Sequence, residues 1–274
     1  MNPLEPLFHS VLSEEKTIEL PKHFSWFVIK DNAVTVRIEC NMLEWRILEH
    51  PSGSLVSLET RETLKKIVPF TKTEVIRKIV KSYLNREDIA VNRLEIENHP
   101  HGLEQCFPLK VHHLKWKMLI CSSRYDYTTW FDCLRSHPID TVDIEWNLED
   151  NTIFSEEVIS LARTVNIQLR VPLTIQAILN FKVKCLTIHQ EICYDDLVEL
   201  CEKWIQQEKP IGSRLILKMK RSEIDFVRTM VSGKYSTKVE NIDRSTFFVL
   251  VTGPKSKVRI LVGDGGGISM TVVE

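Results

Sequence analysis

The sequence lacks an excess of charge of either sign. Its 274 residues include 36 lysines and arginines and 37 aspartates and glutamates, which leaves a formal net charge of −1 at pH 7. Nucleic-acid-binding domains usually have a clear basic balance or a basic face. The composition therefore argues against nucleic acid as a partner. Weak nucleic-acid binding stays open only through five basic residues that would have to share one face: Lys182, Lys184, Lys218, Lys220 and Arg221.

Long apolar runs are missing as well. The first twenty residues include Glu5, Glu14, Glu15 and Glu19, a pattern that does not fit a secretory signal peptide. No segment has the roughly 20 consecutive apolar residues that a membrane span requires. The seven cysteines form no CxxC pair and lie mostly beside apolar residues, as is typical of a reducing compartment. We therefore expect an intracellular protein of the cytoplasm or nucleus with no membrane partner.

The N-terminal region alternates apolar and polar residues with a period of two. This pattern, between residues 24 and 49, predicts a small antiparallel sheet. Thr71 and Glu74 have the spacing of a capping box, so a helix is expected to begin there and to end near Asn85. Residues 1–89 are therefore expected to form an N-terminal β-sheet plus a helix.

Short strand-like runs alternate with short amphipathic segments beyond residue 90. This alternation is typical of strand-helix units beside a mostly parallel sheet, and the spacing of roughly 17–30 residues overlaps that of leucine-rich repeats. No LxxLxLxxN ladder is present, so the expected fold class is α/β with irregular, leucine-rich-repeat-like units. The expected strands are 93–96, 111–120, 141–146, 166–171, 183–188 and 214–219; the expected helices are 127–135, 155–164, 194–207 and 222–231, with a short turn at 174–179.

The end of the chain returns to alternating strands, expected at 246–251, 257–262 and 268–273. We expect them to form a β-meander that caps the repeat-like domain of residues 90–274. The glycine-rich segment Gly263–Gly267 could suggest a phosphate loop, but that site needs a helix N-terminus directly after the glycines. Only a strand-like segment follows, so a hairpin turn is the preferred interpretation.

Several histidines and a cysteine lie close together in the sequence, namely His99, His101, Cys106, His112 and His113. Zinc accepts such ligands when four of them converge tetrahedrally. Adjacent His112 and His113 would point to opposite faces of a strand, and the spacing of Cys106 fits no common zinc motif. We therefore expect no metal site.

Signatures of catalysis are also missing. No nucleophile elbow or related local motif is present. The adjacent acids Glu156–Glu157 and Asp195–Asp196 stand at expected helix starts, where they compensate the helix dipole rather than form an acid-base pair. No catalytic or cofactor-binding residue and no cofactor is assigned. We expect the chain not to be an enzyme, although a site assembled from distant residues stays open as the alternative.

Aromatic residues near the middle of the chain point to a possible interface. Tyr125 and Tyr127 lie beside Arg124, a combination that is enriched in protein interfaces. Trp130 and Phe131 fall on one face of an expected helix and are therefore assigned to the core.

The second half of the chain shows a resemblance to a known family. An apolar helical turn at 173–181 precedes a strand at 183–188, and the next helix ends in Trp204–Ile205 before a turn at Ile211–Gly212. In this pattern, clearest over residues 141–219, the chain resembles the F-box-associated domain (type 2) of the large nematode F-box families. Trp204 and Gly212 match as structural positions. The F-box helices that normally come first are not recognisable in residues 1–23.

The resemblance implies a region that binds a substrate or partner, joined to an F-box that docks a Skp-type adaptor and a cullin. We therefore expect a non-enzymatic protein-protein interaction module, similar to the substrate-recognition part of F-box proteins in SCF-type ubiquitin ligases. The expected partner is another polypeptide, with a Skp-type adaptor as a further candidate. An enzyme with a spatially assembled site and a weak nucleic-acid-binding module are the alternatives.

Overall fold

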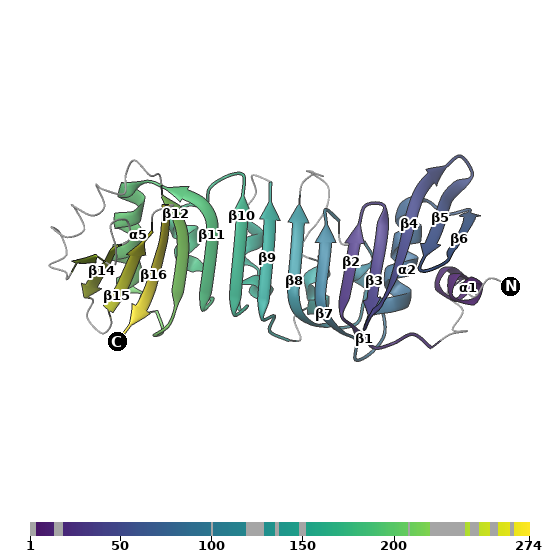
Figure 1. Cartoon of the computed structure of the whole chain (residues 1–274), viewed down its shortest axis with the longest axis horizontal. Coiled ribbons are helices and arrows are strands. Elements are labelled where there is room, and N and C mark those ends of the chain that lie inside the picture. Colours follow the sequence, from purple (N-terminus) through teal and green to yellow (C-terminus); the bar gives the residue numbers. More distant parts are fainter. Residues whose placement is uncertain are drawn as a thin grey trace. The chain divides into compact units, whose positions relative to one another are not determined.

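A computed structural model describes residues 4–13, 19–99, 101–118, 129–134, 137–147, 152–207, 209–219, 239–241, 247–252, 257–263 and 266–274 (Figure 1). The chain divides into two compact units, Met1–Asp143 and Ile144–Glu274. The boundary expected near residue 89 lies inside the first unit, between α2 (Lys72–Leu84) and β7 (Ala90–Glu97). Among the described helices, none is long and apolar enough to cross a membrane.

The first unit is built on a mixed sheet with the strand order β8-β7-β2-β3-β4-β5-β6. The strands β2, β7 and β8 pair in parallel, and the strands from β2 to β6 form an antiparallel meander. The short β1 adds to β7 in parallel. The bounds are β1 His23–Phe24, β2 Trp26–Lys30, β3 Ala33–Ile38, β4 Asn41–His50, β5 Gly53–Glu59, β6 Thr63–Val68 and β8 Lys110–Met118, and β9 Thr141–Trp146 contains the boundary between the units.

The period-two pattern of the N-terminal region produces the antiparallel part of this sheet. Val34 and Val36 of β3 are buried, as are Trp45 and Ile47 of β4, and the residues between them are more exposed. The predicted antiparallel sheet is confirmed and extends to Val68. The turn before β5 requires Gly53, because its φ is +131° and a Cβ there would lie 2.1 Å from the carbonyl oxygen of Val68.

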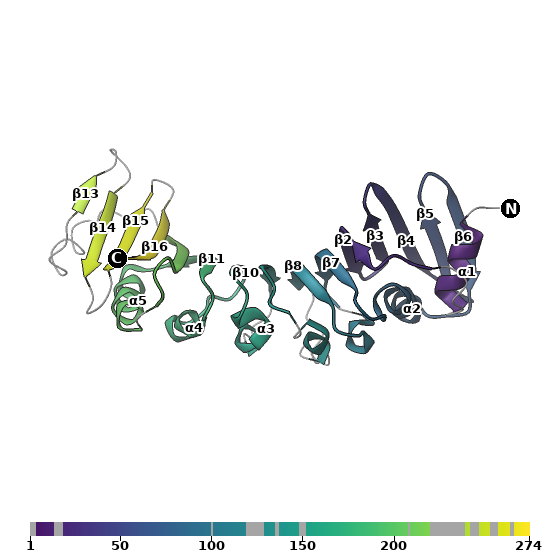
Figure 2. The ribbon, with the colours of Figure 1, turned by 90° about the horizontal axis from the view of Figure 1, so that it is seen from below.

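Two helices cover one side of this sheet (Figure 2). In α2, the Thr71 hydroxyl accepts a hydrogen bond from the Glu74 amide at 3.3 Å, and the Thr71 amide donates to the Glu74 carboxylate at 2.8 Å, so the predicted capping box is confirmed. In α1 (Glu5–Ser13), the ring of Phe8 lies 5.7 Å from that of Trp45. The apolar face of each helix therefore packs onto the buried side of the strands.

In the second unit the strand order is β10-β11-β12-β16-β15-β14-β13. The strands β10, β11 and β12 are parallel, and those from β12 to β13 are antiparallel. Three helices accompany them, α3 Glu157–Ser160, α4 Ile175–Asn180 and α5 Tyr194–Gln206. The strands are β10 Thr164–Leu169, β11 Cys185–Ile192, β12 Arg214–Met219, β13 Val239–Asn241, β14 Phe247–Thr252, β15 Lys257–Val262 and β16 Gly267–Val273.

The expected α/β class with leucine-rich-repeat-like units is wrong. Of the residues that the structure describes, 45% lie in strands and 26% in helices, and the strands form a large mixed sheet rather than strand-helix repeats. The expected helix at 155–164 is only a 3-10 turn, η3 (Thr152–Ser155), and the single turn α3. The C-terminal meander is no separate cap, because β16 pairs directly with β12.

The prediction of an α-helix at 127–135 is also wrong for the described residues 129–134. These residues form the 3-10 helix η2 (Thr129–Leu134), and η1 (Leu103–Gln105) is a further short 3-10 turn. The helix expected at 222–231 lies outside the described residues. Short apolar spacing did not specify α-helices here, since helices below about 12 residues depend on tertiary packing rather than on local pattern.

Aromatic side chains form much of the core in the first unit. Trp116 packs edge-to-face on Trp130 at 5.1 Å, and Trp130 stacks on Phe131 at 4.5 Å between ring centroids. All three are fully buried, so the core assignment of Trp130 and Phe131 is confirmed. In the second unit Trp204 is buried on α5, and the ammonium of Lys209 lies 5.3 Å from its ring.

Candidate functional site

The side of the first unit's sheet that no described helix covers presents charged residues from neighbouring strands. In β7, Leu94 and Ile96 are buried, and Arg93, Glu95 and Glu97 alternate with them. Successive strand residues point to opposite faces, so these three share the side away from the helices. The neighbouring strand β8 has the same alternation in matching register, which places Arg93 beside His113, Glu95 beside Lys115 and Glu97 beside Lys117.

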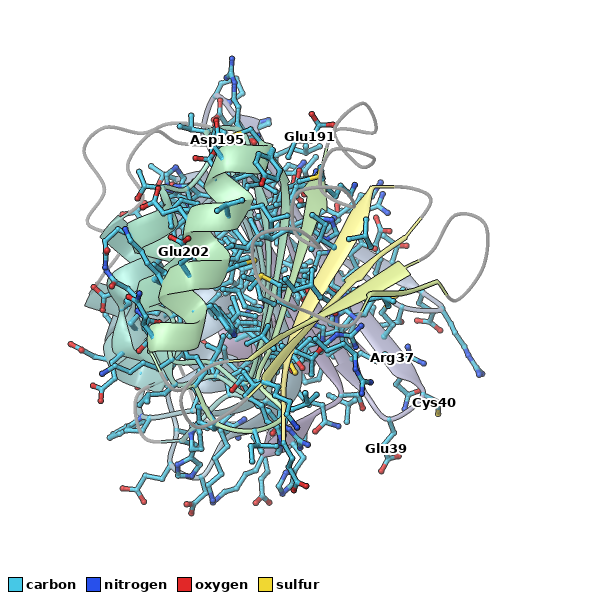
Figure 3. All side chains as sticks on the ribbon, turned by 90° about the vertical axis from the view of Figure 1, so that its left-hand side faces the viewer. Arg37, Glu39, Cys40, Glu191, Asp195 and Glu202 are labelled. Atoms are coloured by element: carbon cyan, nitrogen blue, oxygen red, sulfur yellow. The ribbon has the colours of Figure 1, made fainter. Side chains whose placement is uncertain are left out.

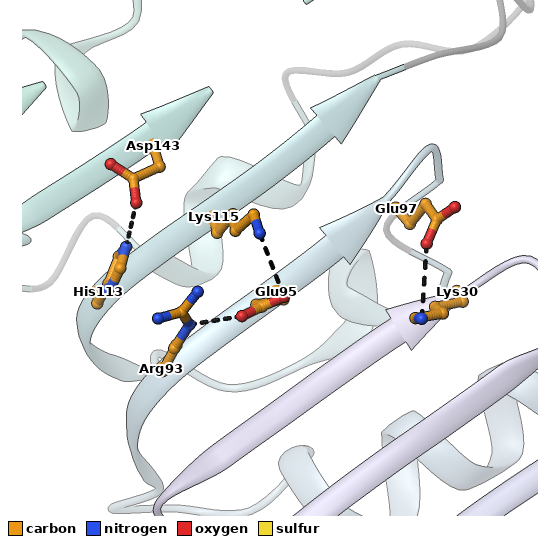
Figure 4. Close-up of polar contacts among 7 residues, drawn as sticks. All are labelled: Lys30, Arg93, Glu95, Glu97, His113, Lys115 and Asp143. Carbon is orange, nitrogen blue, oxygen red and sulfur yellow. Dashed lines mark hydrogen bonds and ion pairs between the residues drawn. The ribbon is translucent and has the colours of Figure 1, made fainter. Parts of the chain in front are cut away.

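Ion pairs connect these side chains across and along the strands (Figure 4). The Glu95 carboxylate lies 2.5 Å from Nε of Arg93 and 3.9 Å from Nζ of Lys115. We call the whole group the charged face. It also contains the pair of Lys30 on β2 with Glu97 on β7 at 3.8 Å, and the pair of His113 on β8 with Asp143 on β9 at 2.7 Å. Its members are Lys30, Arg93, Glu95, Glu97, His113, Lys115 and Asp143.

These pairs contribute little to the stability of the fold. The side chains of the charged face are between 17% and 49% exposed, and pairs of this kind are worth about 0–1 kcal/mol each. Charges of both signs on a sheet face that no described helix covers do favour a partner with the complementary pattern and exclude like-charged ones. The arrangement is therefore better suited to recognition than to stabilisation.

The histidines considered as metal ligands separate into two groups. The rings of His99 and His101 lie 5.3 Å apart, and the thiol of nearby Cys106 donates to the carbonyl of Gly102. His112 and His113 pair with different carboxylates, those of Asp140 at 3.2 Å and Asp143 at 2.7 Å. Within the described ranges, no group of three or more His, Cys, Asp or Glu residues is placed to hold a metal ion.

His101 lies in a partly buried polar region at the end of β7. Burial, followed by the neighbouring His99, lowers the pKa of His101 to about 4. Asn98, which adopts a left-handed φ of 61°, donates from its side chain to the Asp31 carboxylate at 2.7 Å. Its carbonyl accepts from the indole of Trp116 at 3.2 Å. The bend at Asn98 therefore connects β7 to the β2–β3 turn, a contact that sequence pattern did not indicate.

The described cysteines with buried thiols are poor nucleophiles. Burial raises the pKa of Cys106 and of Cys201 to about 12 and also raises that of Cys133. A thiol needs a lowered pKa to react as a thiolate at neutral pH. The environments of Cys106, Cys133 and Cys201 therefore favour packing over catalysis.

The paired acids are not brought into a common site. Asp195 and Asp196 are exposed in the first turn of α5, where Figure 3 labels Asp195 at the start of the helix. Glu156 precedes α3, and Glu157 is its first residue. Both pairs thus stand at helix N-termini, as predicted for charges that compensate the helix dipole.

Other predicted residues are only partly covered by the structure. Tyr125, Tyr127 and Arg124 lie outside the described residues, as do Lys220 and Arg221. The remaining basic residues are exposed: Lys218 is on β12, and Lys182 and Lys184 precede β11.

A comparison with protein families gives one match. Residues 72–221 match the family described as Domain of unknown function (DUF3557), which is more than half of the chain. The chain belongs to the DUF3557 family. Its DUF3557 region begins with α2 and extends past β12, and it contains every member of the charged face except Lys30. Searches of curated proteins and of solved structures gave no match.

The sequence did contain a signal for the charged face. In 93–97 and again in 113–117, charged or histidine residues alternate with apolar ones, which indicates strands with one uncovered side. What the local pattern lacked was the pairing of β7 with β8, which places Glu95 beside Lys115.

Proposed function

We propose that the chain is a non-enzymatic protein-interaction module that binds another polypeptide through the charged face. The observation that supports this most strongly is the set of positive and negative side chains in register on strands β2, β7 and β8, with Asp143 of β9 paired to His113 (Figure 4). Regular strands hold such side chains in fixed positions, so little order has to be gained when a partner binds.

The family resemblance adds a finer proposal about the fate of the bound partner. The segment that resembles nematode F-box-associated domains, residues 141–219, lies within the DUF3557 region. On this proposal the bound polypeptide is a substrate that a Skp-type adaptor and a cullin bring to ubiquitination. The charged face then selects the substrate, and an F-box provides the connection to the ligase.

The centre of the charged face, Arg93, Glu95 and Lys115, can be inverted without breaking its ion pairs. The triple variant Arg93→Glu, Glu95→Lys and Lys115→Glu keeps opposite charges side by side and reverses the pattern that a partner meets. A matched control, Glu199→Lys with Lys203→Glu, swaps an exposed pair on α5. Both variants should fold as the original chain does, since exposed pairs contribute only about 0–1 kcal/mol.

The test is affinity purification of the tagged chain and both variants from the protein's own cells, with quantitative mass spectrometry. We expect specific partners to fall about tenfold or more with the triple variant and to be retained by the control. The same partners at unchanged levels with both variants would show that the charged face is not the binding surface. Recovery of a Skp-type adaptor and a cullin supports the ligase proposal, and their absence beside other specific partners counts against it.

A further inference from the structure

The edge strand β6 of the first unit is a second surface that the proposed function does not use. Among the described strands, β6 pairs with β5 alone. An edge strand presents a row of backbone N–H and C=O groups that can pair with another strand. The side chains around this edge determine which strand would fit.

An apolar row runs across the sheet and ends at β6. Leu48 of β4 pairs with Leu55 of β5, which pairs in turn with Ile67 of β6. Directly paired residues share one face of a sheet, so the three form a continuous line. Leu48 and Ile67 are exposed, at 55% and 53%. A strand added beside β6 would extend this line if it placed an apolar residue next to Ile67.

The neighbouring row of paired residues contains two cations, and Lys65 is the one on the edge strand. Arg46, Ser57 and Lys65 are paired across β4, β5 and β6. The guanidinium of Arg46 lies 2.9 Å from the Glu44 carboxylate and 3.5 Å from that of Glu59. These contacts pair Glu44 and Glu59 with Arg46. Lys65 itself is exposed and has no ion pair with any residue in the described part of the chain.

The second lysine of β6 faces the other side of the sheet. Lys66 pairs with Glu5 of α1 at 2.5 Å and lies 5.7 Å from the ring of Phe8, on the side that the helices cover. Because neighbouring strand residues point to opposite faces, Lys65 and Ile67 share the uncovered side. An added strand would meet a lysine and an isoleucine there, two residues apart.

A second copy of β6 does not fit this edge well. Antiparallel pairing of β6 with itself places Lys65 or Lys66 opposite or next to a lysine of the other copy in every register that pairs most of the strand. Like charges directly opposite each other destabilise a strand pair, whereas opposite charges and apolar pairs stabilise it. The edge therefore favours a strand with an acidic residue and an apolar residue.

We propose that β6 accepts an extended peptide segment of a partner protein by strand addition, with an acidic residue beside Lys65 and an apolar residue beside Ile67. Backbone pairing supplies the attachment, and these two side chains select the sequence, as in other cases of strand addition. This site is separate from the charged face, so either surface can fail its test without affecting the other.

The probe is a fluorescein-labelled peptide, Thr-Val-Thr-Asp-Thr-Val-Thr, titrated with the full chain and followed by fluorescence anisotropy. Valine stands on both sides of the aspartate, so the peptide can satisfy Lys65 and Ile67 in either strand direction. We expect saturable binding that weakens about fivefold or more with Lys65→Glu or with Ile67→Thr. A peptide with lysine in place of aspartate should bind Lys65→Glu better than it binds the original chain. The control variant Lys203→Glu should bind like the original chain.

Backbone pairing has its own signature. Only alternate amides of an added strand face the edge, so N-methylation of one alternate set should abolish binding and N-methylation of the other set should not. The proposal would be overturned if both sets of N-methylated peptides lost binding equally, or if no binding were seen at millimolar peptide. It would also be overturned if neither Lys65→Glu nor Ile67→Thr weakened binding. Sedimentation of the chain alone should show no dimer that Ile67→Thr dissociates, since such a dimer would assign the edge to a second copy.

Discussion

At the residue scale, His101 shows how the surroundings of one side chain change its chemistry. It lies against His99 and is partly buried, and both the loss of hydration and the adjacent ring disfavour its charged form. Arg77 and Lys72 act in the same direction, and Asp31 opposes them. The folded chain therefore holds this imidazole neutral at pH values where an exposed histidine is already charged.

This difference predicts a pH-dependent loss of stability. The pKa of His101 is about 4 in the folded chain, against an ordinary value of 6.5. Its contribution is therefore complete above pH 6.5 and is lost as the pH falls from 6.5 towards 4. Allowing for partial exposure, it is worth roughly 1–2 kcal/mol. Urea unfolding at pH 7 and pH 4.5 should show a smaller drop for His101→Gln than for the original chain. Equal drops would contradict the assignment.

At the scale of elements, α2 is the helix whose start is best defined. Its capping box satisfies backbone N–H groups at both Thr71 and Glu74. We predict that Thr71→Ala lowers the free energy of unfolding by about 1 kcal/mol, because the cap is lost from a helix that packs on the sheet. Chemical denaturation measures the effect. Thr71→Ser is the control and should retain most of the stability, since its hydroxyl can accept the same hydrogen bond.

The elements also show how far a single sequence could predict this fold. The capping box of Thr71 and Glu74 depends only on residues close together in the sequence, so the start of α2 was predictable. The strands β12 and β15 were predictable too, since their observed bounds match the expected ones. The segment 155–164 failed because Val158, Ile159 and Ala162 are buried at helical spacing, yet β10 already begins at Thr164. A chain that must enter a strand so soon has room for only one helical turn.

Part of the candidate site was also predictable from the local sequence pattern. Strand alternation was enough to separate His112 from His113, which pair with different aspartates. The grouping of Glu95 with Lys115, and of Leu48 with Ile67, depends on which strands become neighbours. That choice is made by long-range contacts between strands, which local periodicity does not contain.

At the scale of the whole molecule, the division into two compact units predicts separate responses to core damage. Ile79 of α2 and Leu200 of α5 are both fully buried, one in each unit. Replacing either with alanine should cost about 3 kcal/mol. Hydrogen exchange should increase in β3 and β4 with Ile79→Ala and in β11 and β12 with Leu200→Ala. Equal increases throughout the chain with both variants would mean that the two units unfold together.

The pairing of β1 with β7 has a consequence for the time when the chain is being synthesised. Phe24 is buried in the finished unit and pairs with Val91, which leaves the ribosome much later. At ~5–20 residues per second, that delay is about 3 to 13 seconds. The hairpins between β2 and β6 need only nearby residues and can form during that interval. Until then Phe24 has the ring of Phe27 beside it but lacks its strand partner Val91, and hydrophobic surface left exposed in a partly folded chain is prone to aggregation.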